Sequence, residues 1–156
     1  MRVRVAAITI AQQRVLLVST KGSGPGFLVP PGGGVEVGEG LTEAVEREVR
    51  EEAGLAVTAG PLLAARELQT DDGITLELYF GAQPVPGTTP EAATEGRDVR
   101  WVTPAELPSL PHFPEQLAAL VKAAIAGEAG IALLPRADLR AQTDLAVTTG
   151  GTTHGE

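Results

Sequence analysis

Short segments in which apolar residues alternate with polar ones, or run without interruption, recur along the chain and are typical of β-strands. Such segments occupy residues 2–10, 14–18, 56–58, 62–69, 74–82 and 99–102. The first two lie on either side of Ala11-Gln12-Gln13 and predict a strand pair. Asp71-Asp72-Gly73 predicts a hairpin turn between two later segments. A short edge strand is also expected over residues 131–134.

Two segments have helical spacing of their apolar residues instead. One runs from residue 41, and its inward stripe is expected to contain Leu41, Ala44, Val45 and Val49. The other extends over Phe113–Ala126, with a helical turn expected before it at residues 103–106. Strands mixed with helices in this order predict an α+β or α/β fold.

Acidic side chains enter the inward stripe of the first helix. Glu48 and Glu52 project into the stripe and Glu51 lies at its edge, whereas Glu43, Glu46 and Arg50 face solvent. An ordinary solvated helix with i,i+4 ion pairs (Glu43/Arg47, Glu46/Arg50, Arg47/Glu51) explains the outward residues but not the inward acids. Neighbouring carboxylates that lose hydration repel one another, so they require a positive partner.

Carboxylates without histidine or cysteine neighbours suit Mg²⁺ or Mn²⁺, and these ions usually complete their coordination with phosphate oxygens. The three glycines Gly32, Gly33 and Gly34 predict a loop that lets a backbone carbonyl turn toward a metal, with Gly33 as the candidate and Gly34 serving the turn alone. The residues therefore predict metal-assisted chemistry on a phosphate ester or anhydride.

The segment from Gly33 to Leu55 resembles the signature of the Nudix (MutT-like) hydrolases, Gly-x5-Glu-x7-Arg-Glu-U-x-Glu-Glu-x-Gly-U, where U is a bulky aliphatic residue. Every specified position is filled: Gly33, Glu39, Arg47, Glu48, Val49, Glu51, Glu52, Gly54 and Leu55. The resemblance implies an α/β/α sandwich with a mixed β-sheet between helices. It also implies that Glu48, Glu51 and Glu52 bind the metal, that Arg47 orients these carboxylates and that Glu39 steadies Arg47. Gly54 fits the left-handed residue that ends the helix.

Similar proteins often add an acid from a later loop, and Glu95 is the candidate here, with Glu91 and Asp98 as weaker ones. Glu51, Glu52 or Glu95 is expected to be the general base, and the sequence does not separate them. Phe27 and Tyr79 are candidates for stacking on a nucleobase, although either residue type is more often found in the core.

The implied reaction is metal-dependent hydrolysis of a phosphoanhydride in a nucleoside diphosphate linked to another group, such as a (d)NTP or a nucleotide sugar. The alternative is a catalytically silent nucleotide-binding or sensor module on the same fold. Sensors usually have broken signatures, and this signature is complete.

The length and charge of the chain bear on its partners, its location and its domain organisation. The chain has 156 residues and a formal net charge of -8, which argues against nucleic-acid polymers and anionic membranes as partners. It has no cysteine, no membrane-spanning run and no cleavable signal pattern, so a cytoplasmic enzyme is expected. One domain is predicted over residues 1–135. Residues 136–156 are expected to form a flexible tail or, less favoured, a homodimer contact.

Overall fold

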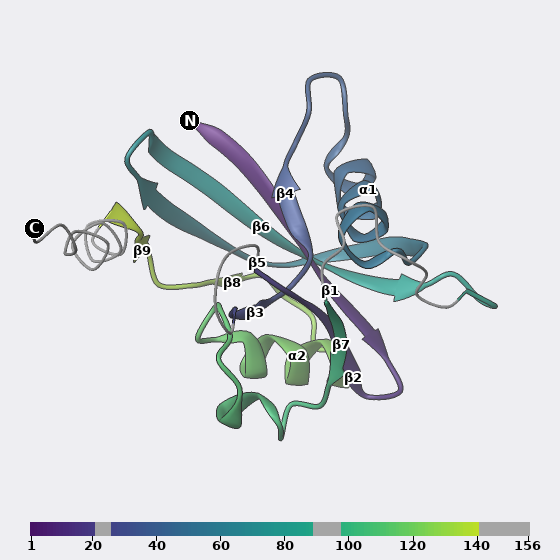
Figure 1. Cartoon of the computed structure of the whole chain (residues 1–156). Coiled ribbons are helices and arrows are strands. Elements are labelled where there is room, and N and C mark those ends of the chain that lie inside the picture. Colours follow the sequence, from purple (N-terminus) through teal and green to yellow (C-terminus); the bar gives the residue numbers. More distant parts are fainter. Residues whose placement is uncertain (21–25, 89–97, 141–156) are drawn as a thin grey trace, which may run out of the picture.

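The computed structural model describes residues 1–20, 26–88 and 98–140 (Figure 1). The helices are α1 (Leu41–Ala53), the 3₁₀ turn η1 (Leu107–Ser109) and α2 (Leu117–Ala126). The strands are β1 (Arg2–Ala11), β2 (Arg14–Ser19), β3 (Leu28–Val29), β4 (Gly32–Gly34), β5 (Val57–Thr70), β6 (Gly73–Pro84), β7 (Val99–Val102), β8 (Ala132–Leu133) and β9 (Ala137–Asp138).

Strand β1 lies at the centre of a mixed sheet. It runs parallel to β6 and antiparallel to β4, and its end pairs antiparallel with β2. Strand β5 forms an antiparallel hairpin with β6 and runs parallel to β8 and β9, while β2 also pairs with β3 and β7. Helix α1 lies on one face and α2 on the other (Figure 1). The predicted α/β/α sandwich with a mixed sheet is confirmed.

Each face of the sheet has its own core, and β1 contributes to both. Val5 packs with the residues of α1, whereas Ile8 packs with those of α2. Val45 and Val49 of α1 join Phe80 on the first face, and Leu117 of α2 joins the second. Because both faces are covered, β1 and β2 carry nearly continuous apolar runs instead of strict alternation.

Strand β5 is longer than the sequence predicted. The segments expected over 56–58 and 62–69 form one strand, and its pairing with β6 shifts register between Ala59 and Leu62 and again between Leu62 and Ala64. Gly60 and Pro61 lie at the first irregularity. Since proline has no backbone N–H and glycine weakens a strand, these residues are typical of a β-bulge, which bends a strand without ending it.

Helix α2 begins at Leu117, later than the predicted start at Phe113. The backbone N–H of Phe113 donates to the carbonyl of Leu28 at 3.1 Å, and the N–H of Leu28 donates to the carbonyl of Pro111 at 2.9 Å. Residues 111–113 therefore pair with β3 and are not available for a helix. The expected turn at 103–106 is present: the N–H of Glu106 donates to the carbonyl of Thr103 at 3.1 Å, and η1 follows at Leu107–Ser109.

The edge strand expected over residues 131–134 is present as β8, and β9 pairs with β5 beyond it. Strand β9 lies past the predicted domain end at residue 135. The rest of the predicted tail, from residue 141, lies outside the described residues. Among the described residues no helix is long and apolar enough to cross a membrane.

Candidate active site

Helix α1 presents its acidic residues as its phase predicted. Glu48 is 7% exposed and Glu52 is 3% exposed, beside the buried Val45 and Val49. The side chain of Glu51, at the edge of the stripe, is 39% exposed. The predicted place of Leu41 in the inward stripe is wrong, because this residue begins the helix beside an exposed loop and is 40% exposed.

The glycine segment before the helix is a short strand, β4, rather than the predicted loop, and it touches the acids directly. The N–H of Gly32 donates to Glu52 Oε2 at 2.8 Å. A Cβ added to Gly33 would lie 2.3 Å from Glu48 Oε1, so only glycine leaves room for this carboxylate. The carbonyl of Gly34 accepts a hydrogen bond from Arg47 at 3.0 Å, which is more than the turn that the sequence assigned to Gly34.

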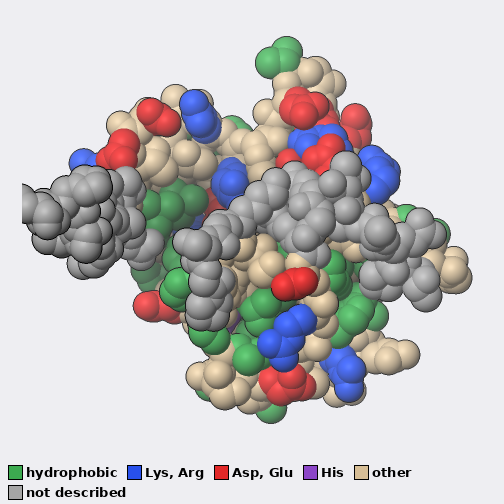
Figure 2. Space-filling view, viewed as in Figure 1, with side chains coloured by type: hydrophobic (Ala, Val, Ile, Leu, Met, Phe, Trp, Pro, Cys, Tyr) green, Lys and Arg blue, Asp and Glu red, His purple; other side chains and the backbone are tan. Residues whose placement is uncertain are grey.

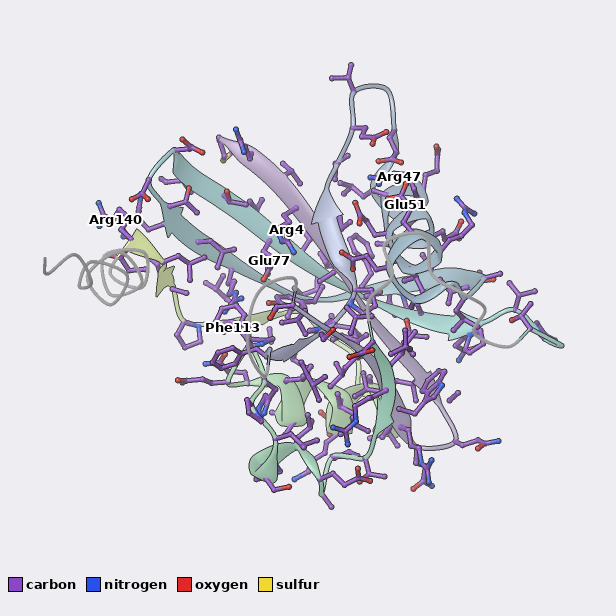
Figure 3. All side chains as sticks on the ribbon, in the orientation of Figure 1. Arg4, Arg47, Glu51, Glu77, Phe113 and Arg140 are labelled. Atoms are coloured by element: carbon purple, nitrogen blue, oxygen red, sulfur yellow. The ribbon has the colours of Figure 1, made fainter. Side chains whose placement is uncertain are left out.

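Arg47 connects the acidic side chains to one another (Figure 3). Its Nε and Nη2 donate to the two carboxylate oxygens of Glu39 at 2.6 and 3.0 Å. Its Nη1 donates to Glu48 at 2.8 Å and to Glu51 at 3.2 Å. These are the contacts that the predicted roles of Arg47 and Glu39 require. Part of the positive charge that the acids need is therefore supplied by the chain itself.

These contacts shift the proton affinities of the pair. The hydrogen bond from Arg47 lowers the pKa of Glu39, and the same bond is the largest cause of a raised pKa at Arg47. Both groups are therefore charged at neutral pH. Figure 2 shows the acidic side chains gathered around basic ones over α1.

The outward face of α1 differs in one respect from the prediction. Glu46 was expected to face solvent, but it is only partly exposed and accepts a hydrogen bond from the N–H of Ala59 at 3.1 Å. Glu46 therefore ties the helix to β5, and the solvent-facing assignment holds for Glu43 and Arg50.

The donor set suits a divalent cation by its chemistry. Glu48, Glu51 and Glu52 offer hard oxygen ligands, and the missing side chain at Gly33 leaves a cradle for Glu48. As the side chains lie, no group of three acidic or histidine residues converges into a metal site within the described part of the chain. Arg47 Nη1 contacts both Glu48 and Glu51, so a bound cation would share these carboxylates with Arg47.

A family model, the NUDIX domain, matches residues 1–123. The chain belongs to the NUDIX family. This confirms the resemblance to the Nudix hydrolases that the signature predicted. Nudix hydrolases generally use divalent metal ions and act on small nucleotide substrates.

Solved structures with the Nudix fold resemble this chain. A NUDIX hydrolase from Nitrosomonas europaea is 24% identical with a TM-score of 0.68, and the match covers 81% of this chain and 90% of that one. The E. coli ORF135 protein is 28% identical with a TM-score of 0.65, over 83% and 91% of the two chains. A UDP-X diphosphatase is 25% identical with a TM-score of 0.68, over 85% of this chain and 66% of that one. No curated protein matches the chain.

The remaining predicted site residues differ in their exposure to solvent, and some lie outside the described residues. Glu95 and Glu91 are outside the described residues, so the role given to Glu95 stays a prediction. Phe27 is 55% exposed. Tyr79 is 1% exposed and its hydroxyl donates to Glu77, so its ring belongs to the core beneath the surface and has no open face for stacking on a base. Gly54 ends α1 with φ of 65°, as predicted.

Sequence reasoning missed a group of charged side chains close to the Nudix site. Arg66 and Glu77 are buried on neighbouring strands, and both are in contact with each other. The sequence did offer a signal for this pair. Both residues are charged, and they occupy positions that face the core in two strands predicted to form a hairpin. The hairpin turn sets the register that places Arg66 opposite Glu77, because the shifts in the β5–β6 pairing lie beyond Ala64, farther from the turn.

Proposed function

We propose that this chain hydrolyses a phosphoanhydride bond in a nucleoside diphosphate linked to another group, such as a (d)NTP or a nucleotide sugar, with Mg²⁺ or Mn²⁺. The observation that carries the proposal is the set of contacts around Arg47, which brings the acidic residues of a complete signature together. A structural neighbour named a UDP-X diphosphatase is in line with substrates of this class.

Glu48, Glu51 and Glu52 would hold the cation, and the carbonyl of Gly33 would be a further oxygen ligand. When bound, the cation polarises the phosphate oxygens and lowers the pKa of an attacking water. The residues of the chain keep the carboxylates in place. Arg47 holds Glu48 and Glu51 from one side, and the N–H of Gly32 holds Glu52.

The proton of the attacking water would pass to Glu51, Glu52 or Glu95. Among the two candidates on α1, Glu52 has one oxygen bound to a backbone N–H and is 3% exposed, whereas the side chain of Glu51 is 39% exposed. The greater exposure of Glu51 gives it access to a water, and the burial of Glu52 suits a fixed ligand. We therefore favour Glu51 over Glu52 as base.

The experiment is a substrate panel of nucleoside triphosphates, nucleotide sugars and dinucleotides with Mg²⁺ or Mn²⁺, with phosphate, pyrophosphate and nucleotide products measured. Glu52→Gln should lower kcat by at least about 100-fold. Glu43→Gln is the matched control, because it makes the same change on the exposed face of the same helix. Undiminished hydrolysis by Glu52→Gln would refute the site. Tight nucleotide binding without turnover of any compound would instead support the silent sensor.

A further inference from the structure

A pocket of about 580 Å³ opens beside β4. Its lining includes Arg4, Gly34, Glu77 and Phe113. Gly33, the residue before Gly34, adjoins Glu48 of the acidic site, and the carbonyl of Gly34 binds Arg47. Strand β4 therefore adjoins the pocket through Gly34 and the acidic residues through Gly33.

A network of charged residues reaches one wall of this pocket, which Arg4 and Glu77 line. Glu77 is 5% exposed, and its Oε1 accepts hydrogen bonds from Arg66 at 2.9 and 3.1 Å and from the hydroxyl of Tyr79. The guanidinium of Arg66 lies 4.2 Å from the ring centroid of Phe113. The other oxygen of Glu77 accepts a hydrogen bond from Arg4 Nε at 3.0 Å. Figure 3 shows Arg4 and Glu77 together, with Phe113 below them.

Arg4 is the exposed end of this network. Its side chain is 43% exposed, whereas the side chain of Arg66 is 2% exposed. Its Nε is bound to Glu77, but among the described residues its two terminal amino groups have no partner. Glu77 thus fixes the guanidinium plane of Arg4 and leaves donors available for a ligand at the pocket.

The charges of the network favour an anionic ligand. Arg4 and Arg66 together outweigh Glu77 by one positive charge, in a protein whose formal net charge is -8. Burial raises the pKa of Tyr79, so its hydroxyl stays neutral. Buried ion pairs seldom stabilise a fold more than apolar residues of the same size would. Stability alone is therefore a weak reason for placing these charges in this wall.

We propose that Arg4 binds a phosphate group of the substrate beside the acidic site, and that Glu77 is the positioning residue that holds the guanidinium of Arg4 for this contact. The inference rests on the proposed function, since it assumes a nucleotide substrate. Arginine suits this task because its planar donors match phosphate oxygens, often in pairs.

Binding without turnover tests the role of Arg4. Calorimetry would measure the Kd of each of the four common nucleosides and of the corresponding nucleoside diphosphates, with Mg²⁺ present. Arg4→Gln should weaken diphosphate binding by about 10- to 100-fold, the usual range for a hydrogen bond to a charged group, and should change nucleoside binding less than about twofold.

Arg14→Gln is the matched control. Arg14 begins β2, loses the same charge on substitution, is exposed and does not line this pocket. It should change the diphosphate Kd less than about twofold. Equal losses in the two variants would overturn the proposal in favour of a general field effect. Equal weakening of nucleoside and diphosphate by Arg4→Gln would overturn it in favour of base recognition, and no weakening would leave Arg4 a structural role.

A double-mutant cycle tests the role of Glu77. Glu77→Gln should weaken diphosphate binding, and the double variant with Arg4→Gln should bind no more weakly than Arg4→Gln alone, because Glu77 acts through Arg4. Additive losses would refute the positioning role. Arg4→Lys keeps the positive charge but removes the Nε donor that Glu77 binds. Its Kd for the diphosphate should lie between those of wild type and Arg4→Gln, and this measurement tests the proposal if Glu77→Gln does not fold. If the diphosphate binds and its binding depends on Arg4, but no compound of the substrate panel is hydrolysed, the proposed function is wrong and the phosphate-binding role of Arg4 stands.

Discussion

Replacement of Gly33 by alanine tests whether the position of Glu48 controls the site. The added Cβ would lie 2.3 Å from Glu48 Oε1 and 2.6 Å from Glu48 Cδ, where ordinary contacts begin at 3.4 Å. Either the carboxylate or β4 must therefore move by about 1 Å. Glu48 is bound to Arg47 at 2.8 Å, so a shift of this size breaks that hydrogen bond.

The expected losses follow from that displacement. Forcing an extra methyl group into a packed site costs about 1–3 kcal/mol of unfolding free energy. For a chain of this length each kcal/mol lowers Tm by about 2–4 °C. A misplacement of about 1 Å in a catalytic arrangement lowers kcat/KM by about 100-fold. Gly33→Ala should therefore fold, melt several degrees lower and lose most of its activity.

Gly34→Ala is the matched control for this experiment. The same methyl group one residue later meets no heavy atom within 4 Å. We expect a loss of kcat/KM at least tenfold smaller than in Gly33→Ala, and a Tm close to wild type by differential scanning calorimetry. Glu48→Asp shortens the carboxylate, so in that background Gly33→Ala should lower Tm less. Equal effects of the two alanine variants on activity and Tm would refute the steric reasoning.

Three further predictions concern the signature and the C-terminal strands. Arg47 lowers the pKa of Glu39, so their pairing stabilises the fold above the usual glutamate pKa near 4.5, and this stabilisation is lost as the pH falls through the lowered pKa. The Tm difference between wild type and Glu39→Gln should therefore shrink below about pH 4. A Tm difference that stays constant with pH would contradict this prediction. Gly54→Ala places a Cβ on a residue in the left-handed region, with φ of 65°. Chemical denaturation should show a loss of about 1–2 kcal/mol of unfolding free energy, and kcat should be retained. An unchanged denaturation midpoint would argue against backbone strain at the end of α1. The hydrogen bond from Arg140 lowers the pKa of Asp138 to about 2, and in Arg140→Gln this pKa should rise toward 3.8, as measured by NMR titration. The same Asp138 pKa in wild type and variant would contradict this pairing.

Patterns within short stretches of sequence predicted most of the elements. The inward placement of Glu48 and Glu52 followed from helical phase, and the end of α1 followed from Gly54. Predictions failed where a distant strand competed for the backbone. Phe113, the predicted start of the second helix, pairs with β3, and β5 continues through Gly60 because β6 supports it on both sides of the bulge.

The sequence by itself determined the family, the acidic residues of the proposed site and the face of α1 on which they lie, because fixed spacing and helical periodicity are local properties. Only the tertiary structure decided what these residues touch. The contact of Arg4 with Glu77 spans 73 positions, and those of Glu52 with Gly32 and of Arg47 with Gly34 also join separate elements. Such contacts depend on which strands pair and in which register, and a shift of one residue would turn each strand side chain to the opposite face.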